Sequence, residues 1–192
     1  GEVMGNKRIS TACVLMGMGL AAAALIVSAP SGNASAAAAK GTTAVAVIHG
    51  TQGNEKVSGT IKFVQTDKGV EIEAHVMGLP DGKHGFHIHE FGDTSAADGA
   101  SLGGHFNPHG KPHGSPDMGG ERHAGDLGNI ESKGGHAEYK RVDNVIELDG
   151  ANCILGRGFV VHGGEDDCTT QPTGNAGARL GVGVIGVAKA AS

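Results

Sequence analysis

Histidine is the residue type that sets this sequence apart, with 11 copies among 192 residues. His87 and His89 stand two positions apart in a segment of alternating polarity, so both side chains should project from the same face of a strand. Further downstream, an irregular stretch holds four more candidate ligands, separated by 8, 10 and 3 residues: His105, His113, His123 and Asp126. Imidazoles and a carboxylate are the donors that tetrahedral zinc sites use. The pattern therefore predicts metal binding.

One more candidate, His162, ends the apolar segment 158–162, just before a Gly-Gly turn. Taken singly, each of these histidines could equally be a surface residue, or a core residue whose hydrogen bonds are satisfied. Six histidines and an aspartate in this arrangement are too many for that explanation, so together they favour a metal site.

Short strands have to position these side chains. Residues alternate between polar and apolar with a period of two, as in half-buried strands, or form short apolar runs. We expect strands over 44–49, 57–65, 70–76, 84–90, 126–131, 136–142, 158–162 and 180–188. The segment 145–148 is ambiguous and is placed in a long connection. Eight short strands with two long loops predict an all-β sandwich or a closed barrel.

Composition excludes several other classes of protein. The 35 glycines disfavour long helices, where each costs about 1 kcal/mol relative to alanine. A net charge of −5 without a basic run argues against nucleic-acid binding. The stretch 91–123 has no periodicity, and a structureless loop of this length in a small domain is usually functional.

The N-terminal residues resemble a secretory signal peptide. Met4 is the expected start, with Gly1–Val3 as extra residues, and Lys7 and Arg8 precede the apolar run 11–29. Ala34-Ser35-Ala36 provides a cleavage site, so residues 1–36 are predicted to be removed. The alternative is an uncleaved membrane anchor, since 19 apolar residues nearly span a bilayer. We expect export to the periplasm or the cell exterior, with no stable membrane association after cleavage.

Five segments, in order, resemble the copper/zinc superoxide dismutase family: GFHIHEFGD (85–93), HFNP (105–108), ERHAGDLGNI (121–130), GRGFVVH (156–162) and TGNAGARLGVGVIGVA (173–188). The resemblance extends from about Thr43 to Ala188. It implies an eight-stranded antiparallel Greek-key barrel, or immunoglobulin-like sandwich, with two long functional loops. The resulting domain, 43–192, would follow a flexible linker over 37–42.

The resemblance implies one copper and one zinc per subunit. The implied copper ligands are His87, His89, His105 and His162. The implied zinc ligands are His105, His113, His123 and Asp126. His105 would therefore bridge the two metals. Imidazoles stabilise both Cu(II) and Cu(I), whereas three histidines and one carboxylate close a zinc site and leave no open position, which indicates a structural role.

Other residues match family positions outside the ligand set. Asp166 matches a carboxylate that joins a copper ligand to a zinc ligand, although it could be an ordinary acidic loop residue. Arg179 matches the active-site arginine, whose permanent charge would attract and orient a small anion; the alternative is a surface arginine. Arg122 and Arg157 match as loop anchors, and His84 matches as a core or hydrogen-bonded residue. Four histidines have no assigned role: His49, His75, His109 and His136.

Two departures from the family pattern stand out. The usual disulfide between the metal loop and the last strand is missing, because Val182 occupies the strand position and the loop position falls near Asp98 or Gly99. Metal and packing must then hold the loop 92–104. The loop 163–178 is also short and carries few of the charged residues that guide the substrate in the family.

A substitute disulfide between Cys153 and Cys168 is disfavoured by reach. Nine extended steps from Cys153 to His162 span about 30 Å, whereas six steps back to Cys168 span at most about 20 Å. A disulfide needs Cα atoms within roughly 7 Å. We therefore expect free thiols or an intermolecular contact.

The function that the resemblance implies is dismutation of superoxide, 2 O₂⁻ + 2 H⁺ → O₂ + H₂O₂, by a histidine-bound copper that cycles between oxidation states beside a structural zinc. Within it, His105 and Arg179 would be catalytic. The alternatives are a non-catalytic copper or zinc buffer on the same scaffold and an immunoglobulin-like adhesion module. The expected partner is the superoxide anion, and a homodimer remains open.

Overall fold

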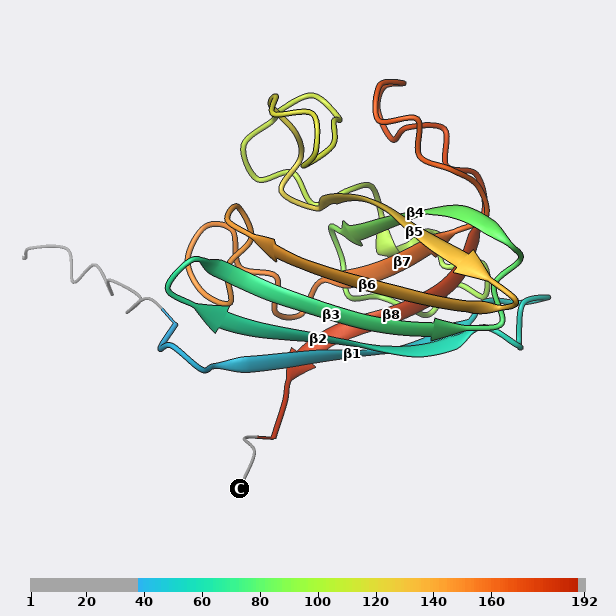
Figure 1. The fold of residues 1–192 in the computed structure, drawn as a ribbon, viewed down its shortest axis with the longest axis horizontal. Helices are drawn as coiled ribbons and strands as arrows, with labels where there is room; N and C mark the ends of the chain where they lie inside the picture. Colours follow the sequence, from blue (N-terminus) through green and yellow to red (C-terminus); the bar gives the residue numbers. More distant parts are fainter. Residues whose placement is uncertain (1–37, 190–192) are drawn as a thin grey trace, which may run out of the picture. The chain divides into compact units, whose positions relative to one another are not determined.

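The alternating polarity of the sequence becomes the inner and outer faces of a closed β-barrel in the computed structural model, which describes residues 38–189 (Figure 1). The eight strands are β1 (Thr43–Gly50), β2 (Ser58–Thr66), β3 (Gly69–Met77), β4 (Gly82–His89), β5 (Asp126–Lys133), β6 (His136–Asp143), β7 (Gly158–His162) and β8 (Arg179–Val187). One 3-10 turn, η1 (Ala100–Leu102), is the only helical element of the described residues. All eight predicted strands are present, with ends shifted by up to two residues.

The strands follow the order β1-β2-β3-β6-β5-β4-β7-β8 around the barrel, and every neighbouring pair is antiparallel. β3 and β4 follow one another in the chain but are separated in the barrel by β6 and β5, which is a Greek-key crossing. Pairing of β1 with β8 closes the barrel, with Ala46 opposite Ile185. Of the two architectures that the strand pattern allowed, the closed barrel is the one that forms.

Aromatic rings fill the barrel interior. The ring of Phe159 lies 4.4 Å from that of Phe86 and 6.1 Å from that of Phe63, centroid to centroid, and all three side chains are fully buried. The segment 145–148 lies in the connection between β6 and β7, as predicted, where Ile146 and Leu148 join the same core.

Both long connections leave the same side of the barrel in Figure 1: 90–125 between β4 and β5, and 163–178 between β7 and β8. They cover the outer face of β4, so that this strand is buried on both faces from His84 to His89. Residues 1–37, which include the whole predicted signal peptide and the first residue of the predicted linker, lie outside the described part. No helix among residues 38–189 is long and apolar enough to cross a membrane.

Candidate metal centre

Four buried histidines converge beneath the two long connections. The ligand atoms that they offer all lie within 4.8 Å of one another: His87, His89, His105 and His162. His87 and His89 extend from the outer face of β4, because Phe86 and Ile88, which alternate with them, point into the core. His162 ends β7, and His105 reaches the group through an isolated antiparallel bridge with His89.

A second group lies beside the first and shares a member with it. Its four ligand atoms meet the same 4.8 Å limit: His105, His113, His123 and Asp126. The first three belong to the long connection and Asp126 begins β5, so the strand start anchors the loop ligands. The structure thus brings together both predicted ligand sets without exception.

His105 connects the two groups through its two ring nitrogens. Nδ1 lies 2.7 Å from Oδ1 of Asp126, within the second group. The ring as a whole lies 4.2 Å from that of His87 in the first group, centroid to centroid. A single imidazole can therefore serve both groups at once.

Two buried ring nitrogens have no polar partner among the described residues: Nδ1 of His87 and Nε2 of His105. A third, Nδ1 of His113, lacks a well-aligned hydrogen bond and has only Oδ2 of Asp126 nearby, at 3.1 Å. A buried polar atom without a partner costs about 1–3 kcal/mol, so native structures rarely keep one. The opposite nitrogen of each ring contacts Asp166 or Asp126, so these atoms are the ones left to bind a cation. The donor chemistry and the unpartnered atoms fit a metal in each group.

Asp166 contacts one histidine of each group. One carboxylate oxygen lies 2.8 Å from Nε2 of His87, and the other lies 2.9 Å from Nε2 of His113. Burial raises the pKa of this carboxyl, but the hydrogen bonds from His113 and His87 outweigh burial and leave the pKa below its usual value. The carboxylate thus stays charged and fixes the ring orientation of one histidine in each group.

Burial lowers the pKa of three of the rings. It lowers the pKa of His105 to about 4 and that of His162 to about 3, and it lowers the pKa of His89 well below its usual value. Burial also acts to lower the pKa of His113, but hydrogen bonds to Asp126 and Asp166 raise it to about 9. Neutral imidazoles have a free lone pair, which a metal ligand needs.

Comparison with known proteins agrees with this geometry. The profile of the family described as copper/zinc superoxide dismutase matches residues 57–185. Superoxide dismutase [Cu-Zn] A of Xenopus laevis is 48% identical over 141 residues, which is 70% of this chain and 92% of the relative. Superoxide dismutase [Cu-Zn] 5 of Dictyostelium discoideum is 48% identical over 156 residues, 77% of this chain and 99% of the relative.

The chain belongs to the copper/zinc superoxide dismutase family. Among solved structures, the clock protein EA4 superimposes with a TM-score of 0.70 at 38% identity, over 80% of this chain and 99% of that one.

Arg179, which matches the arginine of the superoxide dismutase family, lies at the rim of the first group. It is the register partner of His162 across β7 and β8, and its positive charge acts to lower the pKa of both His162 and His89. Its guanidinium donates hydrogen bonds to the carbonyl oxygens of Gly99 and Gly103. A fixed cation thus faces the ligands of the first group.

The predicted supporting residues also have clear partners. Arg122 donates to the carbonyl oxygens of His123, Ala124 and Asp126, so it anchors the second group as expected. Arg157 anchors the loop that follows β4 by donating to the carbonyl oxygen of Glu90 at 2.7 Å.

The remaining histidines lie outside both groups. His84 is buried, and its ring nitrogens lie 2.8 and 2.9 Å from the carbonyl oxygens of His162 and Pro80, so it is a hydrogen-bonded core residue as predicted. The four histidines without an assigned role belong to neither group: His49, His75, His109 and His136.

Two glycines of the site were not singled out in the sequence. A Cβ at Gly174 would lie 1.7 Å from Oδ1 of Asp166, and a Cβ at Gly85 would lie 2.8 Å from the ring of His87. Both positions therefore need glycine, because His87 approaches the backbone at Gly85 and Asp166 approaches it at Gly174. Gly174 also has φ +68, and its place in the TGNAG segment is the signal that could have revealed it.

The positions of the absent family disulfide face each other. A Cβ at Gly99 would lie 2.9 Å from Cγ1 of Val182, which places the loop position at Gly99. Cys153 and Cys168 are free and half-buried. The expectation that metal and packing alone hold the loop 92–104 was incomplete, because the loop also receives hydrogen bonds from Arg179.

Proposed function

We propose that this protein converts superoxide to oxygen and hydrogen peroxide at a copper held by the first group, beside a structural zinc held by the second group. The first group is His87, His89, His105 and His162, and the second is His105, His113, His123 and Asp126. The observation that carries the proposal is the sharing of His105, because a plain metal-binding protein has no need of two adjoining sites joined by one ring.

Bound copper supplies a one-electron redox couple, and bound zinc supplies fixed positive charge. The chain supplies the rest. Arg179 attracts and orients the anion by a permanent charge at the rim of the first group. His105 offers Nε2, the unpartnered atom on the side of the first group, as the place where a proton can be held, while Asp126 fixes the opposite nitrogen.

Reconstitution and turnover test this proposal. The metal-free protein should take up about one copper and one zinc per chain, measured by mass spectrometry, and should then consume superoxide in a pulse-radiolysis assay. His89→Ala, which removes one copper-site donor but leaves the zinc group intact, should lose activity and keep zinc. Stoichiometric copper uptake without turnover in the wild type would favour the metal-buffer alternative.

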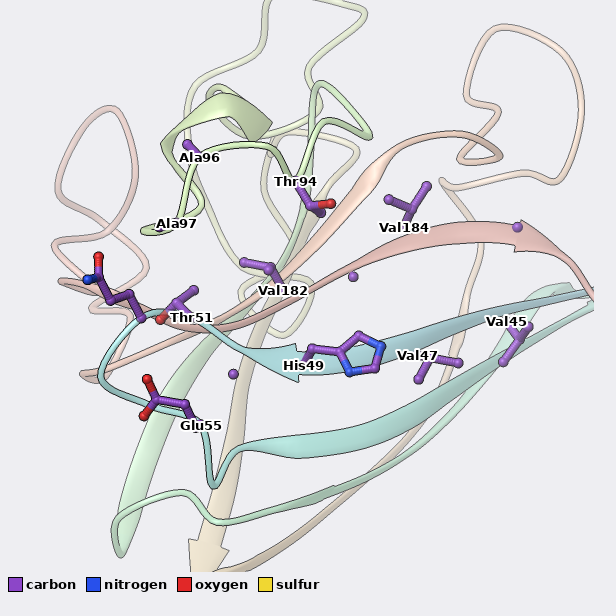
Figure 2. A pocket seen from close by; sticks show the side chains of 14 residues that line it. Val45, Val47, His49, Thr51, Glu55, Thr94, Ala96, Ala97, Val182 and Val184 are labelled. Carbon is purple, nitrogen blue, oxygen red and sulfur yellow. The ribbon is translucent and has the colours of Figure 1, made fainter.

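We also propose a homodimer through the outer face of β1 and β8. Val47 and Val184 are 50% and 40% exposed there, beside a groove of about 800 Å³ that Val45 and Val182 also line (Figure 2). By contrast, the exposed charged side chains of Lys62, Glu73 and Lys140 are cross-strand neighbours on the outer face of β2, β3 and β6. The valines form an apolar patch beside His49 and Glu55, which also line the groove, and an apolar patch of this kind suits a second copy of the same surface.

Sedimentation measures this association. The wild type should sediment as a dimer, and Val184→Glu should sediment as a monomer because it would place two carboxylates in the apolar contact. Thr60→Glu on the outer face of β2 is the matched control and should remain a dimer. A monomeric wild type at high concentration would rule the homodimer out.

We further propose that the domain acts outside the cytoplasm. The support is the sequence of residues 1–36, whose basic start, apolar run and small-residue cleavage site are typical of a signal peptide. N-terminal sequencing of protein recovered from a bacterial periplasm should begin at Ala37. Retention of the full N-terminus in a membrane fraction would support the anchor alternative.

A further inference from the structure

Leu102 fills a slot on the outer side of the barrel. It is fully buried and forms an apolar cluster with Val160 and Val182 that is separate from the barrel core. Val160 and Val182 are register partners on β7 and β8. A Cβ at Gly158 would lie 1.9 Å from Cδ2 of Leu102, so the absence of a side chain there opens the slot.

The turn that carries Leu102 directs two carbonyl groups toward the metal centre. η1 lies between Gly99 and Gly103, both with φ 75. Arg179 donates from Nη1 to the carbonyl oxygen of Gly99, and from Nη2 to that of Gly103 at 2.6 Å. Nδ1 of His89 donates to the same Gly103 oxygen at 3.0 Å. One turn therefore orients both the guanidinium and a ligand ring of the first group.

Packing is what fixes this turn against the barrel. Cγ1 of Val182 and Cδ1 of Leu102 lie 2.9 and 3.3 Å from where a Cβ of Gly99 would be, so the turn rests directly on the cluster. Neither Gly99 nor Val182 is a cysteine, so no disulfide joins the turn to β8 here, and the two cysteines of the described part are free. Leu102 is the only side chain of the three that comes from the loop itself.

We propose that Leu102 is a positioning residue for anion binding: its insertion beside Gly158 holds the Gly99 and Gly103 carbonyls where they orient Arg179 and His89. The inference rests on the proposed function only in that the anion is superoxide. The geometry of the anion site then depends on the apolar contact of Leu102, which a thiol reductant does not break, and not on a disulfide.

The test is an optical titration that measures how tightly azide, a small anion, binds to the copper- and zinc-loaded protein. Leu102→Ala should keep both metals but raise the azide Kd by about fivefold or more, because Arg179 is no longer held in place. Leu102→Met, which refills the slot, should restore the wild-type Kd. Leu148→Ala removes an equally buried leucine from the barrel core and should lower Tm without changing the azide Kd.

Leu102→Val provides the same comparison with a smaller loss of packing if the alanine variant does not fold. An azide Kd that stays within about twofold of the wild type in Leu102→Ala or Leu102→Val would overturn the inference. So would an equal change in Leu148→Ala. Since azide titration needs no turnover, wild-type protein that binds azide but does not consume superoxide would refute the proposed function and leave this inference standing.

Discussion

At the scale of single residues, Asp126 has the densest set of contacts in the metal centre. Oδ1 lies 2.7 Å from Nδ1 of His105 and 3.2 Å from Nδ1 of His123. Oδ2 accepts hydrogen bonds from the backbone amides of Gly114 and His123 at 3.0 and 2.9 Å. The single carboxylate of the second group is thus also the residue on which its loop is organised.

Asp126→Asn tests this role with little change of shape. The variant should lose most of its zinc and melt at a lower temperature, because the carboxylate is the only charged ligand of the second group. Metal analysis and calorimetry measure the two effects. Asp67→Asn, an exposed aspartate paired with Lys40, is the control and should match the wild type. Full zinc content in Asp126→Asn would remove Asp126 from the ligand set.

Arg179 should act on the rate rather than on the metals. Arg179→Ala should keep copper and zinc but lower kcat/KM by about tenfold, or ~1.4 kcal/mol. The wild-type rate should fall as salt rises, because screening over a Debye length of about 10 Å at 0.1 M weakens attraction to a local cation. In the variant this salt dependence should flatten, and Arg179→Lys should be intermediate. Unchanged kinetics in Arg179→Ala with copper bound would make the arginine a bystander.

Asp98 should oppose Arg179. Its negative charge acts on the guanidinium and so weakens the attraction of an anion, while its Oδ1 accepts a hydrogen bond from the amide of Ala100 at 2.9 Å. Asp98→Asn keeps an oxygen for that bond and removes the charge. We expect kcat/KM to rise by roughly twofold at low salt, or ~0.4 kcal/mol, and the gain to vanish near 1 M salt. A lower rate at low salt would contradict this assignment.

At the scale of elements, the metal centre depends on one loop docking on another. The amide of His113 donates to Oε1 of Gln171 at 2.8 Å, and Nε2 of Gln171 donates back to the carbonyl oxygen of His113 at 2.9 Å. Asp166 and Asn129 exchange a similar pair of hydrogen bonds. The 163–178 connection is therefore fixed both to the longer loop and to β5.

Gly174→Ala should disrupt this docking. Its new Cβ would overlap Oδ1 of Asp166, so the variant should hold less zinc and melt at a lower temperature. Gly177→Ala is the matched control: its φ of +77 gives similar backbone strain, but no atom lies nearer than 4.0 Å to the added Cβ. Zinc content and Tm should fall clearly more in Gly174→Ala. Equal losses in the two variants would mean that strain, not the overlap with Asp166, is responsible.

At the scale of the whole molecule, the barrel is closed by strand pairing, but the loops over it rely on metal and on non-covalent contacts. Bound cations would give partners to the buried nitrogens that lack them, and cations that bind the folded state alone stabilise it by linkage. Both cysteines of the described part are free, so no disulfide shares this task.

Metal removal should therefore lower Tm, whereas reduction should not change it. Chelation of copper and zinc should lower Tm by about 10 °C or more, since each kcal/mol of lost stability shifts Tm by ~2–4 °C in a domain of this size. A thiol reductant should leave the Tm of the metal-loaded protein unchanged. A large drop under reduction that Cys153→Ser or Cys168→Ser abolishes would show a bridge between these cysteines in solution.

The strands and the ligand sets could be predicted from the sequence because both leave local signals. Alternation with a period of two marks each strand by itself, and His87 and His89 share a face whatever lies around them. Residue type and spacing also marked the ligands from distant segments as candidates, but their division into a copper set and a zinc set was predicted only through the family motifs in which they stand. The free state of Cys153 and Cys168 agrees with an estimate of chain reach.

Contacts between segments far apart in the chain were decided by the tertiary structure. Strand patterning allowed a sandwich or a barrel, and only the pairing of β1 with β8 makes it a barrel. The overlap that reserves Gly174 for Asp166, and the slot that Gly158 leaves for Leu102, exist only once separate loops pack together. The physical reason is that periodicity records which face of one strand is buried, whereas steric fit depends on atoms that the folded chain brings within a few ångströms.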